Sequence, residues 1–140
     1  MFGEVYMVKA VTFAQVIDLE TQVNIPTEFL QLIGPQTQKN AVIIYSPTND
    51  LLRIFFTNIS DIYKVEAKLD RLSHEFLSSL GSFLGAHEIT PLYTTGFCEK
   101  DCLYEGYFEI DTLKMSLEEF KKYFSNIPGI SDVKIVHFKI

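Results

Sequence analysis

The sequence predicts an α+β fold, in which a segment rich in β-hairpin precedes a β-α-β-β-α-β module. Two apolar runs, Ala41–Tyr45 and Leu51–Phe56, are joined by the turn-forming residues Ser46–Asp50, a composition typical of a β-hairpin. Side chains over Ile62–Leu69 alternate with the two-residue period of a half-buried strand. Apolar residues over Phe76–Leu84 recur at helical spacing, which predicts an amphipathic helix.

The residues before the hairpin predict strand and a short helix. The stretch Glu4–Glu20 is rich in Val, Tyr, Phe and Ile without helical periodicity, so we expect one long strand or two short ones. Pro26 opens a predicted helix over Thr27–Ile33, because proline is tolerated in the first helical turn. Gly34-Pro35 ends this helix, since glycine can adopt a positive φ and proline cannot continue the helix.

The remaining elements complete the module. The helix over Phe76–Leu84 takes Asp70 or Ser73 as its N-cap and ends near Gly85. A second helix begins at Ser116–Glu119, which matches the capping box, and ends at Pro128-Gly129. The other predicted strands cover Ile89–Phe97, Leu103–Ile110 and Val133–Ile140.

A length of 140 residues suits one domain or two small ones. We expect an N-terminal dimerisation unit over residues 1–58 and a second domain over residues 61–140. The polar residues Thr57–Asp61 would form a short hinge between them.

The charge balance argues against nucleic-acid binding. The net charge is −6, and neither half is basic: residues 1–60 carry three basic and five acidic side chains, and the rest carry nine and thirteen. Affinity for nucleic acid depends on neutralising phosphates with basic side chains. DNA is therefore an unlikely partner.

No stretch is apolar and long enough to span a bilayer, and the N-terminus lacks the features of a signal peptide, so we expect a cytoplasmic protein without membrane contact. No Ser-His-Asp or Cys-His arrangement can be argued from the spacing of His74, His87 and His137. We expect no catalytic residues, no metal and no cofactor.

The two cysteines, Cys98 and Cys102, are expected to be reduced thiols in a loop, because intracellular cysteines rarely form disulfides. A local disulfide closing the loop and a metal site are the alternatives.

The C-terminal eighty residues resemble an ACT domain, a ferredoxin-like β-α-β-β-α-β module. The turn Leu69–Ser73 leading into a helix and the stretch Asn126–Val133 leading into the last strand carry this resemblance. It implies a dimer that binds an amino acid or another small effector where the first strand turns into the first helix. Leu72-Ser73 stands where the family commonly has Pro-Gly.

The candidate ligand site is therefore the turn formed by Asp70, Arg71, Leu72, Ser73 and His74. A guanidinium at a helix N-terminus suits a carboxylate or phosphate ligand. An ordinary capping turn with a solvated arginine is the alternative. On the predicted strand Leu103–Ile110, the aromatic residues either stack on a ligand or are buried in a core or a dimer sheet; these are Tyr104, Tyr107 and Phe108.

The N-terminal part resembles the AbrB-type swapped hairpin. The resemblance rests on Val23–Gly34 followed by the two hairpin strands, and it implies two interleaved copies, because one unit has too few strands to bury its apolar faces. Proteins of this type often bind DNA through basic residues before the proline-led helix. Here the stretch Asp18–Gln22 carries two acids and no base.

The sequence thus predicts a homodimeric, non-enzymatic regulatory protein whose ACT-like domain binds a small metabolite, an amino acid being one candidate. The alternatives are an AbrB-type DNA-binding transcription regulator and a purely structural dimerisation or interaction module.

Overall fold

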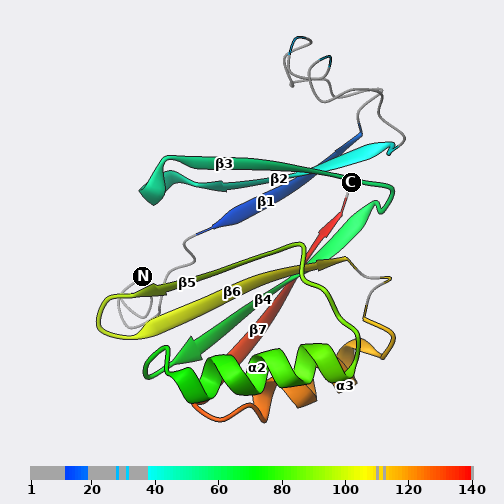
Figure 1. Ribbon diagram of the computed structural model, residues 1–140. Coiled ribbons are helices and arrows are strands. Elements are labelled where there is room, and N and C mark those ends of the chain that lie inside the picture. Colours follow the sequence, from blue (N-terminus) through cyan, green and yellow to red (C-terminus); the bar gives the residue numbers. More distant parts are fainter. Residues whose placement is uncertain are drawn as a thin grey trace, which may run out of the picture.

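The structure is a computed structural model that describes residues 12–18, 28, 31, 38–109, 111 and 113–139. The described residues form three layers: a three-stranded sheet, a four-stranded sheet and a pair of helices (Figure 1). We call the three-stranded sheet, of residues 13–57, sheet A and the four-stranded sheet, of residues 61–139, sheet B. Both sheets are antiparallel.

Sheet A has the strand order β1-β2-β3. The strands are β1 (Phe13–Asp18), β2 (Asn40–Ser46) and β3 (Leu51–Thr57). The hairpin predicted from the two apolar runs is confirmed, with Ala41 paired to Phe56 and Tyr45 to Leu52. Its turn is a short 3-10 helix, η2 (Pro47–Asn49), followed by Asp50 at a φ of 49°.

Part of the N-terminal prediction lies outside the described residues. Strand β1 confirms the strand expected over residues 4–20 for its Phe13–Asp18 portion. The helix expected over residues 27–33 falls outside them apart from two helical positions, 28 and 31, so it stays a prediction.

Sheet B has the strand order β5-β6-β4-β7. Its strands are β4 (Asp61–Leu69), β5 (Tyr93–Cys98), β6 (Cys102–Glu109) and β7 (Ile130–Lys139). Helix α2 (His74–Ala86) follows β4, and helix α3 (Leu117–Ser125) follows β6. The order β4-α2-β5-β6-α3-β7 agrees with the β-α-β-β-α-β order predicted for this segment.

The predicted bounds differ most at the start of β5. The sequence places this strand from Ile89, whereas β5 begins at Tyr93. The amide of Ile89 instead donates to the carbonyl of Leu84, 2.8 Å away, and its buried side chain packs in the core beneath α2. Ile89 therefore packs just beyond the end of α2 and is not part of the strand.

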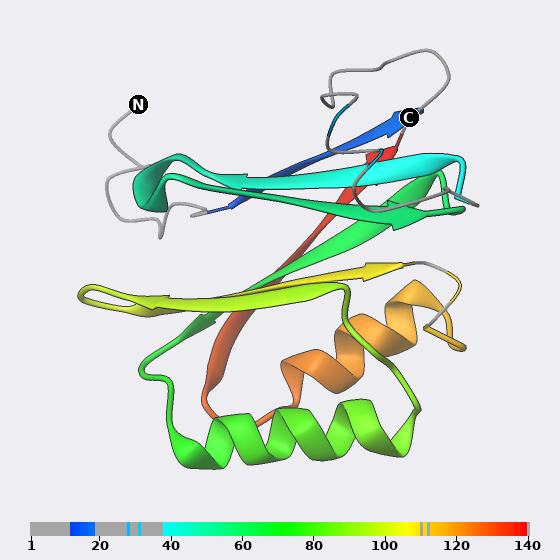
Figure 2. The ribbon, with the colours of Figure 1, turned by 45° about the horizontal axis from the view of Figure 1, so that its top comes forward.

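Both helices cover one face of sheet B (Figure 2). The capping prediction is confirmed for each: the Ser73 hydroxyl accepts from the Phe76 amide at 3.0 Å, and the Ser116 hydroxyl accepts from the Glu119 amide at 3.2 Å. The core between the helices and the sheet contains apolar residues of β4, β6, β7 and both helices, among them Val65, Leu69, Phe76, Leu80, Phe108, Phe120, Phe124 and Val133.

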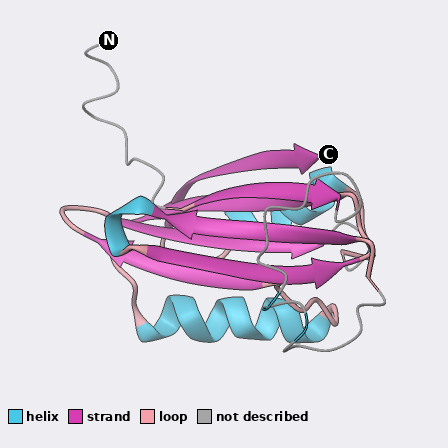
Figure 3. Cartoon of the chain, turned by 90° about the horizontal axis from the view of Figure 1, so that it is seen from above, coloured by secondary structure: helices cyan, strands magenta, loops and turns pink. Residues whose placement is uncertain are grey.

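Sheet A covers the other face of sheet B, so that the two sheets overlie one another when seen from above (Figure 3). A second core joins Val16, Val42 and Ile44 of sheet A to Ile62 and Tyr107 of sheet B. Strand β4 is thus covered on both faces, and the expectation of a half-buried strand is wrong: Lys64, on the face predicted to be polar, is buried.

Hydrogen bonds fix the segment that connects β3 of sheet A to β4 of sheet B. The Thr57 hydroxyl donates to Glu109 of β6 and accepts from the Ile59 amide. The side-chain amide of Asn40 donates to the Ile59 carbonyl at 3.1 Å. The division into domains 1–58 and 61–140 stays a prediction, and the two segments share the core between the sheets.

Candidate functional site

The turn Asp70–His74 connects β4 to α2, as the sequence predicts. Ser73 is the N-cap of α2: its hydroxyl accepts from the Phe76 amide, and its carbonyl accepts from the Leu77 amide at 3.1 Å. Ser73 therefore stabilises the first helical turn, and its hydroxyl is already engaged there. The alternative cap, Asp70, does not fill this role.

Leu72 anchors the turn by packing its side chain against the core and β5. Its side chain is half-buried and packs against the core beneath the helices. The contact with β5 is close: a Cβ added to Gly96 would lie 2.6 Å from Cδ1 of Leu72. The absence of a side chain at Gly96 is what allows Leu72 to sit here. Leu72 therefore packs against the core, and its contact with a ligand stays a prediction.

The other three residues of the predicted site face solvent. Asp70, Arg71 and His74 are exposed, and none of them makes a hydrogen bond or an ion pair with another described side chain. The structure thus divides the five predicted residues into two that fix the backbone of the turn and three whose side chains are exposed.

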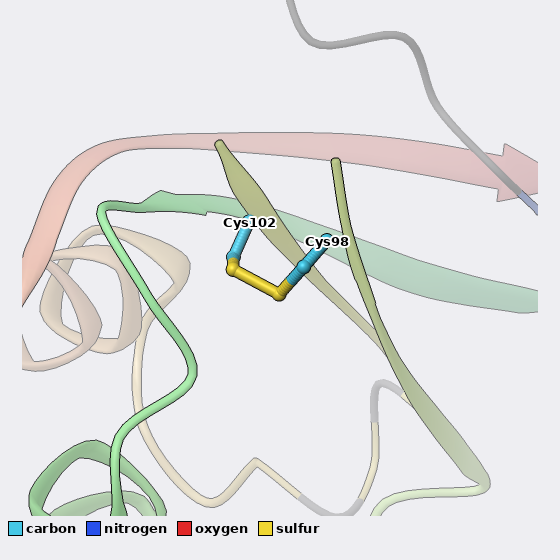
Figure 4. The surroundings of a disulfide bond; sticks show 2 residues. All are labelled: Cys98 and Cys102. Atoms are coloured by element: carbon cyan, nitrogen blue, oxygen red, sulfur yellow. A yellow bond between two sulfur atoms is a disulfide. The ribbon is translucent and has the colours of Figure 1, made fainter. Parts of the chain in front are cut away.

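The hairpin tip beside this turn contains a disulfide between Cys98 and Cys102 (Figure 4). Our expectation of two reduced thiols is therefore wrong, and the metal alternative fails as well, because neither sulfur remains as a thiolate. The two cysteines are direct cross-strand partners at the ends of β5 and β6, so strand pairing brings their sulfurs together. Cys102 also pairs with Leu69, the last residue of β4.

The aromatic residues of β6 are part of the two cores. Tyr104 and Phe108 lie on the helix side of sheet B, and Tyr107 lies between the sheets. All three are buried, which favours the packing interpretation over ligand stacking. The hydroxyl of Tyr104 has no hydrogen-bond partner among the described residues. Burial raises the pKa of both Tyr104 and Tyr107 above the ordinary 10.0.

Sequence reasoning missed a buried polar cluster between the sheets. The ammonium of Lys64 lies 2.7 Å from Glu105 Oε2, 2.7 Å from Glu66 Oε2 and 2.6 Å from the Thr12 carbonyl oxygen. Glu105 Oε1 accepts from the Thr12 amide at 2.9 Å and from its hydroxyl at 2.6 Å. The Thr12 hydroxyl also lies 2.8 Å from the Tyr107 hydroxyl.

This cluster has a structural role, which is to hold the two sheets together. The three donors of the ammonium meet three oxygen acceptors, and both Lys64 and Glu105 are buried. It ties the start of β1 to the middle of sheet B. A signal for it was present in the sequence, since Glu105 interrupts an otherwise apolar and aromatic run over Leu103–Phe108.

Two of the three histidines, His87 and His137, each have a partner of their own. The Nδ1 atom of His87 lies 3.1 Å from the Phe83 carbonyl oxygen, and His137 lies 3.1 Å from Asp61. His74 is exposed at the start of α2. Within the described ranges, no three His, Cys, Asp or Glu side chains are grouped so that they could hold a metal ion.

A scan against protein-family models and a search of curated proteins return no match to this chain. The ACT-like and AbrB-like resemblances therefore stay predictions. Among the described helices, none has the length and apolar character needed to cross a membrane.

Proposed function

We propose that this protein is a non-enzymatic regulatory homodimer that binds a small carboxylate-bearing metabolite, such as an amino acid, at the turn between β4 and α2. In this proposal residues 61–140 adopt the ferredoxin-like arrangement of an ACT-like domain and the N-terminal strands form an AbrB-like dimerisation unit. Ligand binding would stabilise one arrangement of the dimer, a shift of populations that a protein partner could detect.

The observation that carries the proposal is that some residues of the turn fix its backbone while others remain exposed. Leu72 and Ser73 fix its backbone through the contact with Gly96 and the cap on α2. Arg71 and His74 remain exposed without a described partner. A guanidinium can bind a carboxylate with two parallel hydrogen bonds, and because the turn is already fixed, its backbone loses little conformational freedom on binding.

The test is a thermal-shift screen of the purified chain against the amino acids, common nucleotides and a DNA duplex. A ligand at about a hundred times its dissociation constant adds roughly 2.7 kcal/mol of stability, which is a shift of several degrees. The proposal expects a shift from one carboxylate-bearing ligand that is lost in Arg71→Ala. The matched control is Lys121→Ala, which removes an exposed positive charge from α3 and should keep the response.

The DNA-binding alternative makes a different prediction in the same screen, a shift from the duplex alone. The charge distribution gives it no support, since the net charge is −6 and the strands of sheet A contain Arg53 as their one basic residue among the described positions. A purely structural interaction module would show no response to any member of the panel. Either outcome would overturn the effector proposal.

A further inference from the structure

The disulfide closes a short loop at the tip of the hairpin between β5 and β6. Cys98 and Cys102 are four positions apart, and they are the last cross-strand pair of this hairpin. Strand pairing continues from there to Tyr93 opposite Tyr107, so backbone hydrogen bonds also set the register. A disulfide that closes so short a loop removes less chain entropy than one that closes a long loop. The hairpin can therefore exist with the disulfide closed or open.

The two cysteines differ in their access to solvent. Cys98 is exposed on β5, which is an edge strand of sheet B. Cys102 is only 5% exposed and belongs to the core between the helices and the sheet. Thiol–disulfide exchange requires that a thiolate reach one of the two sulfurs. Cys98 is thus the residue through which an external thiolate can reach the disulfide in the folded protein.

Two contacts connect the closed loop to the end of β4. Cys102 is the cross-strand partner of Leu69, the last residue of β4 before the turn Asp70–His74. Within the loop, the Asp101 carboxylate forms an ion pair with Lys68 of β4, at 3.7 Å. The loop that the disulfide closes is therefore joined to the strand from which the turn starts.

A third contact joins the turn to the other strand of the hairpin. Leu72 lies against β5 at Gly96, where an added Cβ would be 2.6 Å from the Leu72 side chain. Gly96 precedes Cys98 by two residues, so both positions lie on the same face of β5. Figure 4 shows the chain from β4 into α2 beside the disulfide. The turn and the disulfide thus share the tip of this hairpin.

We propose that the Cys98–Cys102 disulfide is a redox switch that determines how firmly the turn between β4 and α2 is fixed. With the disulfide closed, the hairpin tip is rigid and the turn packs against it. Reduction gives the loop Glu99–Asp101 more conformational freedom, and the contacts of Lys68 and Leu72 with the hairpin are then weaker. A looser turn loses more freedom when it binds a ligand, so the reduced form binds a carboxylate effector less tightly. This last step rests on the proposed function, whereas the loosening of the turn does not.

The reductant is a dithiol, because the chain has two cysteines and no further thiol that could open the bond. One thiolate of the dithiol attacks Sγ of Cys98, and a mixed disulfide forms while Cys102 leaves as a thiolate. The second thiolate of the reductant then displaces Cys98 from the mixed disulfide. Each protein thiolate takes up a proton. Two electrons pass to the protein, which ends with two thiols, and the reductant ends as a disulfide.

The test compares the natural chain before and after treatment with dithiothreitol under native conditions. Alkylation and mass spectrometry count the thiols, and we expect two after reduction. Backbone order parameters from NMR relaxation then report motion within the folded state. At the amides of Asp70–His74 they should fall from about 0.85 to about 0.6 or below on reduction, while those of β2 and β3 stay near 0.85. The variant Cys98→Ser/Cys102→Ser is the control: it should resemble the reduced chain and should not respond to dithiothreitol.

Two results would overturn the switch. One is a disulfide that dithiothreitol opens only after urea has unfolded the chain. The other is a set of order parameters at the turn that are equal in the oxidised and reduced states. Both measurements are made without effector, so a failure of the switch is distinguishable from a failure of the effector site.

The link to the effector site has its own readout. The amino-acid panel of the thermal-shift screen is repeated on the reduced chain. An amino acid that shifts the oxidised chain should need at least about a fivefold higher concentration for the same shift after reduction. Equal responses in the two states would refute the link. Silence in both states would overturn the effector site and this last step with it, while the switch is decided by the order parameters.

Discussion

The ammonium of Lys64 lies 2.7 Å from Glu105 Oε2 between the two sheets, and both side chains are buried. Buried ion pairs are retained only where further hydrogen bonds satisfy the remaining donors and acceptors. Here the remaining partners are Glu66 and the main chain and hydroxyl of Thr12. The pair therefore also positions the start of β1 on sheet B.

Lys64→Met should destabilise the protein by about 3–5 kcal/mol, because it leaves the Glu105 carboxylate buried without its ammonium. Urea denaturation measures the free energy of unfolding. The double variant Lys64→Met/Glu105→Gln should be less destabilised than the sum of the single variants, since the glutamine keeps an acceptor for Thr12 without a charge.

The matched control is Lys68→Met, which removes a lysine from the same strand. Its ion pair with Asp101 spans 3.7 Å and is partly exposed, so the loss should be under about 1 kcal/mol. Equal losses for the two lysine variants would contradict the structural role given to Lys64.

Stability should fall as the pH rises above about 10. Burial raises the pKa of Tyr104 and Tyr107, and for Tyr107 the hydrogen bond with Thr12 opposes this effect. In the unfolded chain these phenols have their ordinary pKa of 10.0 and lose their protons near that pH, while the folded chain retains them. The unfolded state then binds fewer protons, so the free energy of unfolding falls by about 1.4 kcal/mol per pH unit for each tyrosine.

Denaturant titrations at a series of alkaline pH values measure this slope. In Tyr104→Phe the slope should fall to roughly half, since one of the two late-titrating phenols is removed. An unchanged slope in this variant would show that Tyr104 does not cause the loss of stability at alkaline pH.

Gly106→Ala should cost about 1–3 kcal/mol of stability, because the strand has no room for a side chain at this position. An added Cβ would lie 2.5 Å from the Tyr104 hydroxyl and 2.9 Å from Phe108. Thermal denaturation measures the effect. In a Tyr104→Phe background the cost should be smaller, since the nearest atom is gone.

Gly81→Ala is the control for this substitution. An added Cβ at this position in α2 would meet nothing within 4 Å, so the change should stabilise the helix by about 0.5–1 kcal/mol. If both glycine variants changed stability in the same direction, the contact with Tyr104 would not explain the result at Gly106.

The elements that the sequence predicts well are those with local signals. The hairpin of sheet A and the Ser73 and Ser116 caps depend on residues within a few positions of one another. The burial of Lys64 could not be predicted in this way, because the acceptor carbonyl belongs to Thr12, 52 residues away. A lysine that alternates with apolar residues looks like part of a solvated face until the covering sheet is known.

The distinction between features set by neighbouring residues and contacts between distant ones also applies to the candidate site. The sequence predicts the turn and its helix cap, which are local. It could not separate Leu72 from Arg71, because the contact of Leu72 with Gly96 depends on how β5 lies beside the turn. The disulfide was missed for another reason: the expectation of reduced thiols came from the cellular compartment, whereas the pairing of Cys98 with Cys102 follows from the hairpin register.

Reduction of the Cys98–Cys102 disulfide should lower the free energy of unfolding by about 2 kcal/mol, as expected for closing a loop this short. The hairpin should persist, because backbone pairing from Tyr93 to Cys98 sets its register without the disulfide. Thermal denaturation with and without a thiol reductant measures the loss. The variant Cys98→Ser/Cys102→Ser should match the reduced protein and show no response to reductant. Alkylation of both cysteines without prior reduction would contradict the disulfide, and a reductant effect that persists in the double variant would have a different origin.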